Sequence, residues 1–367
     1  MFHEILDNVL HNLFKPLLLF FYLGFSIPLL KVPFEFPKQI YQGLTLYLLV
    51  AIGWHGGEEL ASLSSGELGQ ALGLMVVGFF VNLIIGLSAH FILRKTSKLR
   101  QIDAAAVAGY YGSDSAGTFV TALGVLTAAN IAFSAYMPVM LAVMEIPGCL
   151  VALLLIARLR QRGMDPAGNM PGEPGYTAPA TGAKIHRLLS PEVLRDVFLN
   201  PGLFLLLGGI LVGYVARLQG PGVTKADDIL FIDLFQGMLC LFLLEMGMTA
   251  ARQIRDVKSG GPALVLFGVL APNLFAVFGI AAAHLYALAI GVVFPLGTYV
   301  LFAVLSAAAS YIAVPAIQRL AFPEASPTLP LAASLGLTFS YNVTIGIPLY
   351  IAIARMITGA PGVIAVG

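Results

Sequence analysis

Ten runs of apolar residues follow one another along this chain, each close to the roughly 20 residues that a helix needs to cross a bilayer. Charged residues make up only 11% of the 367 positions and hydrophobic residues 58%, whereas a typical soluble domain has about 25% charged residues. The sequence therefore predicts an all-α polytopic membrane protein with ten transmembrane helices. The runs are Phe14–Leu30, Tyr41–Gly57, Leu72–Leu93, Ala104–Ala128, Phe133–Leu159, Pro201–Leu218, Leu230–Ala250, Pro262–Leu288, Leu296–Leu320 and Leu329–Ile357.

Composition and motifs exclude several function classes. A formal net charge of +1 provides no basic surface for nucleic acid. Cys149 and Cys240 lie inside apolar runs without ligand-spaced neighbours, so we expect core packing and no zinc site. No nucleotide-binding loop or hydrolase motif is present, so we expect no enzyme activity and no organic cofactor.

The two halves of the chain repeat each other. Residues 1–159 and 200–367 each hold five runs, and residues 160–199 between them are rich in Gly and Pro, which is typical of a flexible aqueous linker. A short surface helix is expected to start at Ser190-Pro191-Glu192. The matching pairs, in the same order in both halves, are 42–53 with 236–247, Asn82-Leu83 with Asn273-Leu274, Ala89-His90 with Ala283-His284, Gly112-Ser113 with Ala309-Ser310, and Ile146-Pro147 with Ile347-Pro348.

An odd number of spans per repeat predicts that the second half enters the membrane in the opposite orientation. Basic residues gather at one end of the runs, which the positive-inside rule makes cytoplasmic. We therefore expect an inner (plasma) membrane protein with a cytoplasmic linker at 160–199 and both termini outside. The basic residues are Lys31, Lys38, Arg94, Lys95, Lys98, Arg100, Arg158, Arg160, Arg162, Arg252, Arg255, Lys258 and Arg319.

The fourth and ninth runs each contain a cluster of residues that interrupts a helix. Gly109, Gly112 and Gly117 each lower helix stability by about 1 kcal/mol relative to Ala, and Pro315 removes a backbone donor. Unwound backbone inside a bilayer is tolerated where it lines a site, so we expect two broken helices that cross near the membrane centre. Close packing of small residues is the alternative. The polar residues of the clusters are Ser113, Asp114, Ser115, Thr118, Ser306 and Ser310.

Two acidic residues inside the spans are candidates for cation binding. Ionisable side chains are costly in a bilayer, so Asp114 and Glu145 are functional candidates by default. For Asp114 the structural alternative is a helix cap, made by Asp114 or Ser113. Thr118 and three neutral side chains before Ile347-Pro348 could add oxygen ligands for sodium, with interhelical hydrogen bonds as the alternative. The three neutral residues are Ser340, Asn342 and Thr344.

Several motifs resemble the sodium-dependent bicarbonate transporter family, over nearly the whole chain outside the linker. They are Tyr-Gly-Ser-Asp-Ser-Ala-Gly-Thr-Phe-Val-Thr-Ala (111–122), Met-Glu-Ile-Pro-Gly (144–148), Ala-Ser-Tyr-Ile-Ala-Val-Pro-Ala (309–316), Asn-Val-Thr-Ile-Gly-Ile-Pro-Leu-Tyr (342–350) and Gly-Leu-Thr-Leu-Tyr-Leu-Leu-Val-Ala-Ile-Gly (43–53).

This resemblance implies a gate domain of spans 1, 2, 6 and 7 and a core domain of spans 3–5 and 8–10, in which the broken spans 4 and 9 cross. It further implies a homotrimer, elevator-like movement and, in some members, a PII-like cytosolic regulator, for which the short linker here gives no support. Carried over by motif, the substrate-binding residues are Gly112, Ser113, Ser115, Ala309, Ser310 and Tyr311.

Two positions depart from the family pattern. Tyr311 stands where the best-known cyanobacterial members carry an Asp, and Asp114 stands where a neutral residue is usual. The favoured function is sodium-coupled symport of bicarbonate or a similar small anion. The alternative is a cation/proton antiporter that uses Asp114 and Glu145 as its exchange sites.

Overall fold

The computed structural model describes residues 16–178, 201–254, 260–311 and 313–359, and every regular element in these ranges is a helix. In the first half these are α2 (Pro16–Leu29), α3 (Lys38–Leu60), α4 (Ser65–Thr96), α5 (Gln101–Tyr111), α6 (Ala116–Ala128) and α7 (Met137–Gln161). In the second half they are α9 (Pro201–Leu218), α10 (Pro221–Asp228), η1 (Ile229–Asp233), α11 (Phe235–Gln253), α12 (Gly261–Ala289), α13 (Leu296–Ala307), α14 (Ala313–Ala321), α15 (Thr328–Leu331), η3 (Ala332–Phe339), η4 (Asn342–Gly346) and α16 (Ile347–Thr358), the η elements being π-helical.

The helices confirm a polytopic membrane protein. Within the described residues, five helical stretches are long and apolar enough to span a bilayer. Apolar side chains also face outward on the long helices, as in Leu72 of α4 and Leu274 of α12, which are 64% and 60% exposed. A soluble protein would bury such rows, so these faces suit lipid. The five stretches are Ser65–Thr96, Met137–Gln161, Gly222–Gln253, Gly261–Ala289 and Thr328–Thr358.

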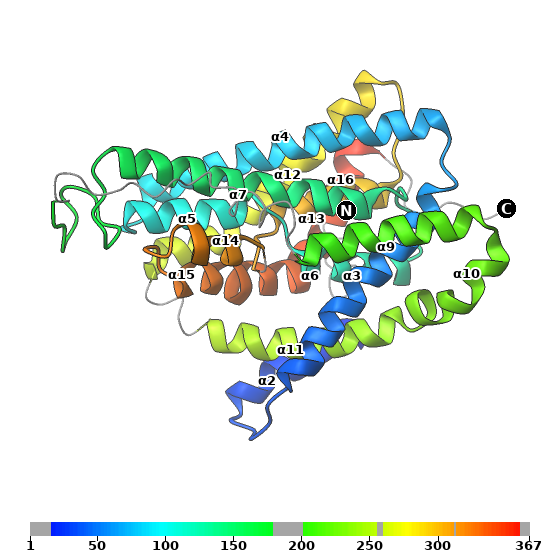
Figure 1. The fold of residues 1–367 in the computed structure, drawn as a ribbon, viewed down its shortest axis with the longest axis horizontal. Helices are drawn as coiled ribbons and strands as arrows, with labels where there is room; N and C mark the ends of the chain where they lie inside the picture. The colour runs from blue at the N-terminus through cyan, green and yellow to red at the C-terminus, as the bar shows by residue number, and fades with distance from the viewer. Residues whose placement is uncertain (1–15, 179–200, 255–259, 312, 360–367) are drawn as a thin grey trace.

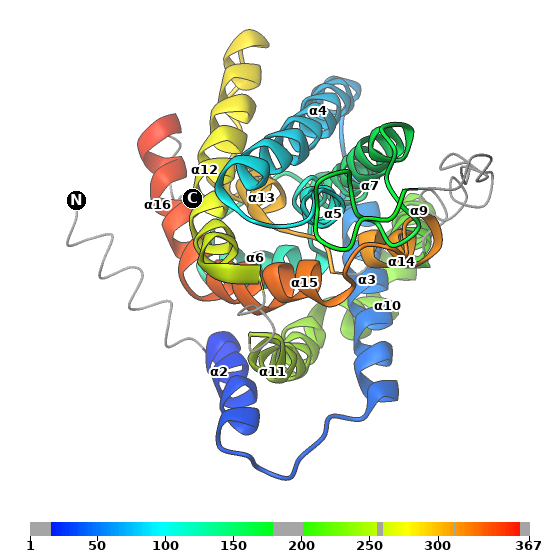
Figure 2. The same cartoon turned by 90° about the vertical axis from the view of Figure 1, so that its left-hand side faces the viewer.

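One group of helices packs in two close pairs, α3 with α9 and α2 with α11. Small residues allow this close approach, because a side chain at Gly57 of α3 would collide with the Ile210 carbonyl of α9. In the same way, a side chain at Gly247 of α11 would collide with the Phe21 carbonyl of α2. Figure 2 shows α2, α3 and α11 along one side of the molecule.

A second group surrounds the buried core. The helices α4, α7 and α12 run along the long axis of the molecule (Figure 1), with α5 and α13 enclosed among them (Figure 2). Nearly every side chain of α5 and every side chain of α13 is buried. These two helices end in the middle of the group, at Tyr111 and Ala307, and the chain continues into α6 and α14. The interruptions expected in the fourth and ninth runs are therefore present.

The described part of the linker differs from the flexible segment that its Gly and Pro content predicts. Residues 162–178 form a loop centred on Asp165, whose Oδ1 accepts from the N–H of Asn169 at 2.7 Å and whose Oδ2 accepts from that of Thr177 at 2.9 Å. The Glu173 carboxylate accepts from the Gln101 N–H at 2.8 Å, which fixes the loop to the start of α5. The surface helix expected at Ser190 lies outside the described residues.

Candidate substrate and ion site

The two helix breaks meet each other directly. The Ser310 N–H, in the second break, donates to the Tyr110 carbonyl at the end of α5 with an N–O distance of 2.8 Å. The Asn82 amide on α4 also joins the two sides, since it donates to the Met144 carbonyl of α7 at 2.8 Å and to the Leu305 carbonyl of α13 at 3.5 Å. Segments nearly 200 positions apart in sequence thus form one buried centre.

Local hydrogen bonds fix the first break, which runs from Gly112 to Ser115. The Ser115 Oγ accepts from the Thr118 N–H at 3.2 Å, so Ser115 is the N-cap of α6. The Thr118 hydroxyl donates to the same Oγ at 2.9 Å. A cap made by Asp114 or Ser113 is therefore wrong, because the residue that follows them occupies the N-cap position. The Ser113 hydroxyl instead donates to the Glu145 carbonyl of α7 at 2.9 Å.

Asp114 is buried without a hydrogen-bonding partner. Its side chain is 1% exposed, and neither carboxylate oxygen bonds to any described residue. The carboxyl group of Glu145, which is partly exposed, lies within electrostatic range. A buried carboxylate without hydrogen bonds is strongly unfavourable on its own. The pair of acids therefore suits a bound cation or an exchangeable proton.

The second break contains the remaining substrate candidates. Ala309 and Ser310 are buried, and the Ser310 Oγ accepts from the Val314 N–H of α14 at 3.4 Å. The Tyr311 ring lies edge-on to Phe339 with a centroid distance of 5.7 Å. Its hydroxyl lies directly over Gly117 of α6, where a side chain would collide with it. Tyr311 thus closes one side of the crossing.

The three neutral candidates on the last span have different surroundings. Asn342 is fully used by the protein, since its Nδ2 donates to the Ala307 carbonyl at 3.0 Å and its Oδ1 accepts from the Tyr350 hydroxyl at 2.7 Å. The Thr344 hydroxyl donates to the Ser340 carbonyl one turn earlier at 2.7 Å. Only the Ser340 Oγ, among these three side chains, is buried without a partner. Asn342 therefore matches the alternative of an interhelical hydrogen bond, through its bond to Ala307 in the second break, whereas Thr344 bonds within its own span.

Two buried polar residues near the crossing were missed by the sequence reasoning. Asn82 bridges the two breaks, and its membership of a repeated Asn-Leu pair was the available signal. Gln318 of α14 accepts from the Tyr110 hydroxyl at 2.8 Å and donates to the Ser326 carbonyl at 3.0 Å. A glutamine in an otherwise apolar run was its only signal.

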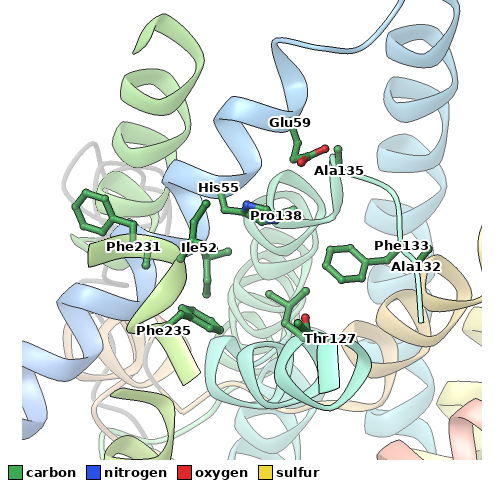
Figure 3. A pocket seen from close by; sticks show the side chains of 13 residues that line it. Ile52, His55, Glu59, Thr127, Ala132, Phe133, Ala135, Pro138, Phe231 and Phe235 are labelled. Carbon is green, nitrogen blue, oxygen red and sulfur yellow. The ribbon is translucent and has the colours of Figure 1, made fainter. Parts of the chain in front are cut away.

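A cavity of about 330 Å³ lies between α3 and α11 on one side and α6 and α7 on the other. Its wall is mostly apolar, and His55 and Glu59 of α3 line it at one end (Figure 3). The labelled side chains in Figure 3 come from both helix groups and face a common space. The two groups are therefore incompletely packed against each other at this end. The other lining residues are Ala51, Ile52, Leu123, Thr127, Ala132, Phe133, Ala135, Pro138, Phe231, Ile232 and Phe235.

Comparison with known proteins agrees with this architecture. The family model for the Na⁺-dependent bicarbonate transporter superfamily matches residues 16–355, which includes both breaks, Asp114 and Glu145. No curated protein matches the chain significantly. Because the match extends over almost the entire sequence, the chain belongs to the Na⁺-dependent bicarbonate transporter superfamily.

Proposed function

We propose that the protein is a secondary active transporter that carries bicarbonate, or a similar small anion, together with sodium. The observation that carries this proposal is the juxtaposition of two helix breaks with a buried, unpartnered carboxylate at Asp114. Broken helices that meet inside a bilayer provide free backbone groups and helix ends for ions. Membership of the superfamily supports bicarbonate and sodium as the transported pair.

The anion would bind at the N-terminal ends of α6 and α14. Free N–H groups and the positive end of the helix dipole favour negative charge at such ends. The hydroxyls of Ser113, Ser115 and Ser310 and the small Ala309 lie there, and the absence of a side chain at Gly112 lets the ligand approach the backbone. Tyr311 would limit the size of the anion from the second break.

Sodium would bind on the acidic side of the same crossing. Hard cations prefer oxygen ligands, and Asp114 offers two unused carboxylate oxygens. Glu145 and the Thr118 hydroxyl are the other proposed ligands of the first break, and Ser340 contributes from the last span. Asn342 and Thr344 support the site through the hydrogen bonds that they make to Ala307 and Ser340.

Alternating access would come from an elevator-type movement of the core group relative to the gate group. The gate comprises α2, α3, α9 and α11, whose close glycine-mediated pairs support a rigid unit. The cavity between α3 and the α6–α7 region supports a boundary along which the core group can move relative to the gate group. We further propose two inverted repeats, a homotrimer joined through the gate, and an inner-membrane orientation with both termini outside and the 160–199 linker cytoplasmic.

Uptake of radiolabelled bicarbonate into proteoliposomes tests this function. An inward sodium gradient should drive accumulation, whereas an equal potassium gradient should not. Nitrate, formate and acetate as competitors would identify the anion class. Uptake that is indifferent to sodium, or no uptake of any of these anions, would reject the symport mechanism.

The cation/proton antiporter remains a second candidate because Asp114 has no hydrogen-bond partner within the part of the chain that the structure describes. An antiporter needs the exchangeable carboxyl for every cycle. The Asp114→Asn variant should therefore abolish sodium-driven proton movement in an antiporter. In a symporter the same variant should keep part of the bicarbonate uptake.

A further inference from the structure

The surroundings of Asp114 leave its charge uncompensated by the protein. Neither neighbouring hydroxyl bonds to Asp114, since Ser113 donates to the Glu145 carbonyl and the Ser115 Oγ accepts from Thr118. Both Asp114 oxygens lack a donor among the described residues, and water cannot replace that donor easily because the residue is only 1% exposed. An ionised carboxylate offers about four lone-pair positions, and none of them is used by a neighbour.

The charged group that interacts with Asp114 is a second acid. Glu145 of α7 is in electrostatic contact with it, whereas no Lys or Arg among the described residues forms an ion pair with either carboxylate. Two like charges in a low-dielectric interior repel each other and also lose their hydration. A cation beside each acid would therefore stabilise the pair when both are ionised.

Another acid in the membrane helices, Glu245, differs from Asp114 because one of its two oxygens has a donor, while its Oε2 is buried without a partner among the described residues. Glu245 of α11 accepts from the Thr249 hydroxyl at 2.8 Å and lies within electrostatic range of Arg252. For Asp114, the described ranges contain no equivalent donor or base. Its repeat counterpart is Tyr311, so the extra acid belongs to the first break alone. The missing partners of Asp114 thus indicate that a ligand binds to its carboxylate.

We propose that Asp114 holds a sodium ion of its own, in addition to one held at Glu145, so that two sodium ions enter with each bicarbonate. This inference rests on the proposed symport function. Two carboxylates and one bicarbonate carry three negative charges, and a single sodium ion would leave two of them uncompensated at the crossing. With two sodium ions the loaded core keeps one negative charge. Each cycle then moves one net positive charge inward, so transport is electrogenic.

The test is the flux ratio of radiolabelled sodium to radiolabelled bicarbonate in proteoliposomes, with and without an imposed membrane potential. The wild-type ratio should be two, and an inside-negative potential should accelerate uptake. In Asp114→Asn, which keeps the side-chain shape, the ratio should fall to one and the response to potential should disappear. Glu245→Gln is the matched control, because it neutralises a membrane carboxyl outside the site and should leave both values unchanged.

Equilibrium binding of radiolabelled sodium in detergent gives a second measurement that does not depend on transport. It should count two sodium ions per chain in the wild type and one in Asp114→Asn. A wild-type ratio or count of one overturns the inference, as does a value of two in the variant. Bicarbonate uptake that needs no sodium overturns the proposed function instead, so the two failures are distinguishable.

Discussion

The Ser310 N–H donates to the Tyr110 carbonyl across the two helix breaks, with an N–O distance of 2.8 Å. Each residue lies where its own helix can no longer supply a partner, because α5 ends at Tyr111 and α13 ends at Ala307. Buried backbone groups need hydrogen bonds, most of all inside a bilayer. The bond therefore satisfies one backbone group of each break and joins the two breaks directly.

Loss of the α6 cap should destabilise the first break. Ser115→Ala removes the Oγ that accepts from the Thr118 N–H, and N-cap losses of this kind cost about 1 kcal/mol. We expect a lower Tm and a higher half-saturating bicarbonate concentration. Ser115→Asn should restore the cap and most of the Tm. An unchanged Tm in Ser115→Ala would contradict the capping role.

The Asn82 amide should matter more for stability than the amide of Asn273. Asn82 is fully buried and donates to carbonyls of both α7 and α13. Asn273 is partly exposed, its Nδ2 donates to the Val269 carbonyl of its own helix at 2.9 Å, and its one bond to another helix among the described residues is accepted from the Tyr341 hydroxyl at 2.7 Å. Asn82→Ala should cost about 1–3 kcal/mol, since it removes a buried donor that joins two helices. Thermal unfolding in detergent should show a larger drop for Asn82→Ala than for Asn273→Ala, and equal drops would refute the bridging role.

An ion pair outside the crossing should stabilise the core group. Arg160 at the end of α7 bonds to Glu324 at 2.8 Å and also donates to the Ala321 carbonyl at 2.9 Å. Glu324→Gln leaves a largely buried guanidinium without its countercharge, at a cost of about 1–3 kcal/mol. The Tm should fall, and the effect should persist at high salt because the pair is shielded from solvent. If high salt removed the Tm difference between Glu324→Gln and the wild type, the pair would be exposed and weak.

The loop at residues 162–178 should open at low pH. Burial raises the pKa of Asp165, but N–H groups of Thr177, Asn169 and Ala167 lower it by more, so the pKa lies below its ordinary value. The carboxylate therefore stabilises the loop fully above an ordinary pKa of about 3.9, and this contribution is lost as the pH falls through the lower folded pKa.

Pepsin cleavage within residues 162–178 measures this opening. Cleavage should increase as the pH falls below about 4, beyond the change in pepsin activity on a denatured control. Asp165→Asn should be cleaved readily even above about pH 4, and its cleavage should increase much less than that of the wild type as the pH falls. A variant with the same pH profile as the wild type would contradict the role of Asp165.

Hydrophobic length and helix-breaking residues predicted much of the fold. The run Pro262–Leu288 differs from α12 by one residue at each end, because apolar stretches of bilayer length are strongly helical. Both interruptions were predicted from Gly, Ser and Pro. The π-helical turns of residues 332–346 had no sequence signal, since they depend on packing of the last span against its neighbours.

The sequence indicated only some of the contacts that the structure shows at the two breaks. The motifs identified Ser113 and Ser310, but the cap at Ser115 and the role of Asn82 depend on which side chain reaches which backbone group in three dimensions. The ordered loop at 162–178 was missed because Gly and Pro are as common in tight turns as in flexible linkers. There, Asp165 and Glu173 supply the bonds that a flexible linker lacks.

Reciprocal coupling of sodium entry and bicarbonate entry is the decisive test of symport. The measurement is entry of radiolabelled sodium into proteoliposomes, with and without external bicarbonate, at zero membrane potential. If both ions bind at one crossing and move together, sodium entry should require bicarbonate. Sodium entry should reach half of its maximum at the bicarbonate concentration that half-saturates bicarbonate uptake. Sodium entry at the same rate without any transported anion would show that the two ions are not coupled and would contradict the account.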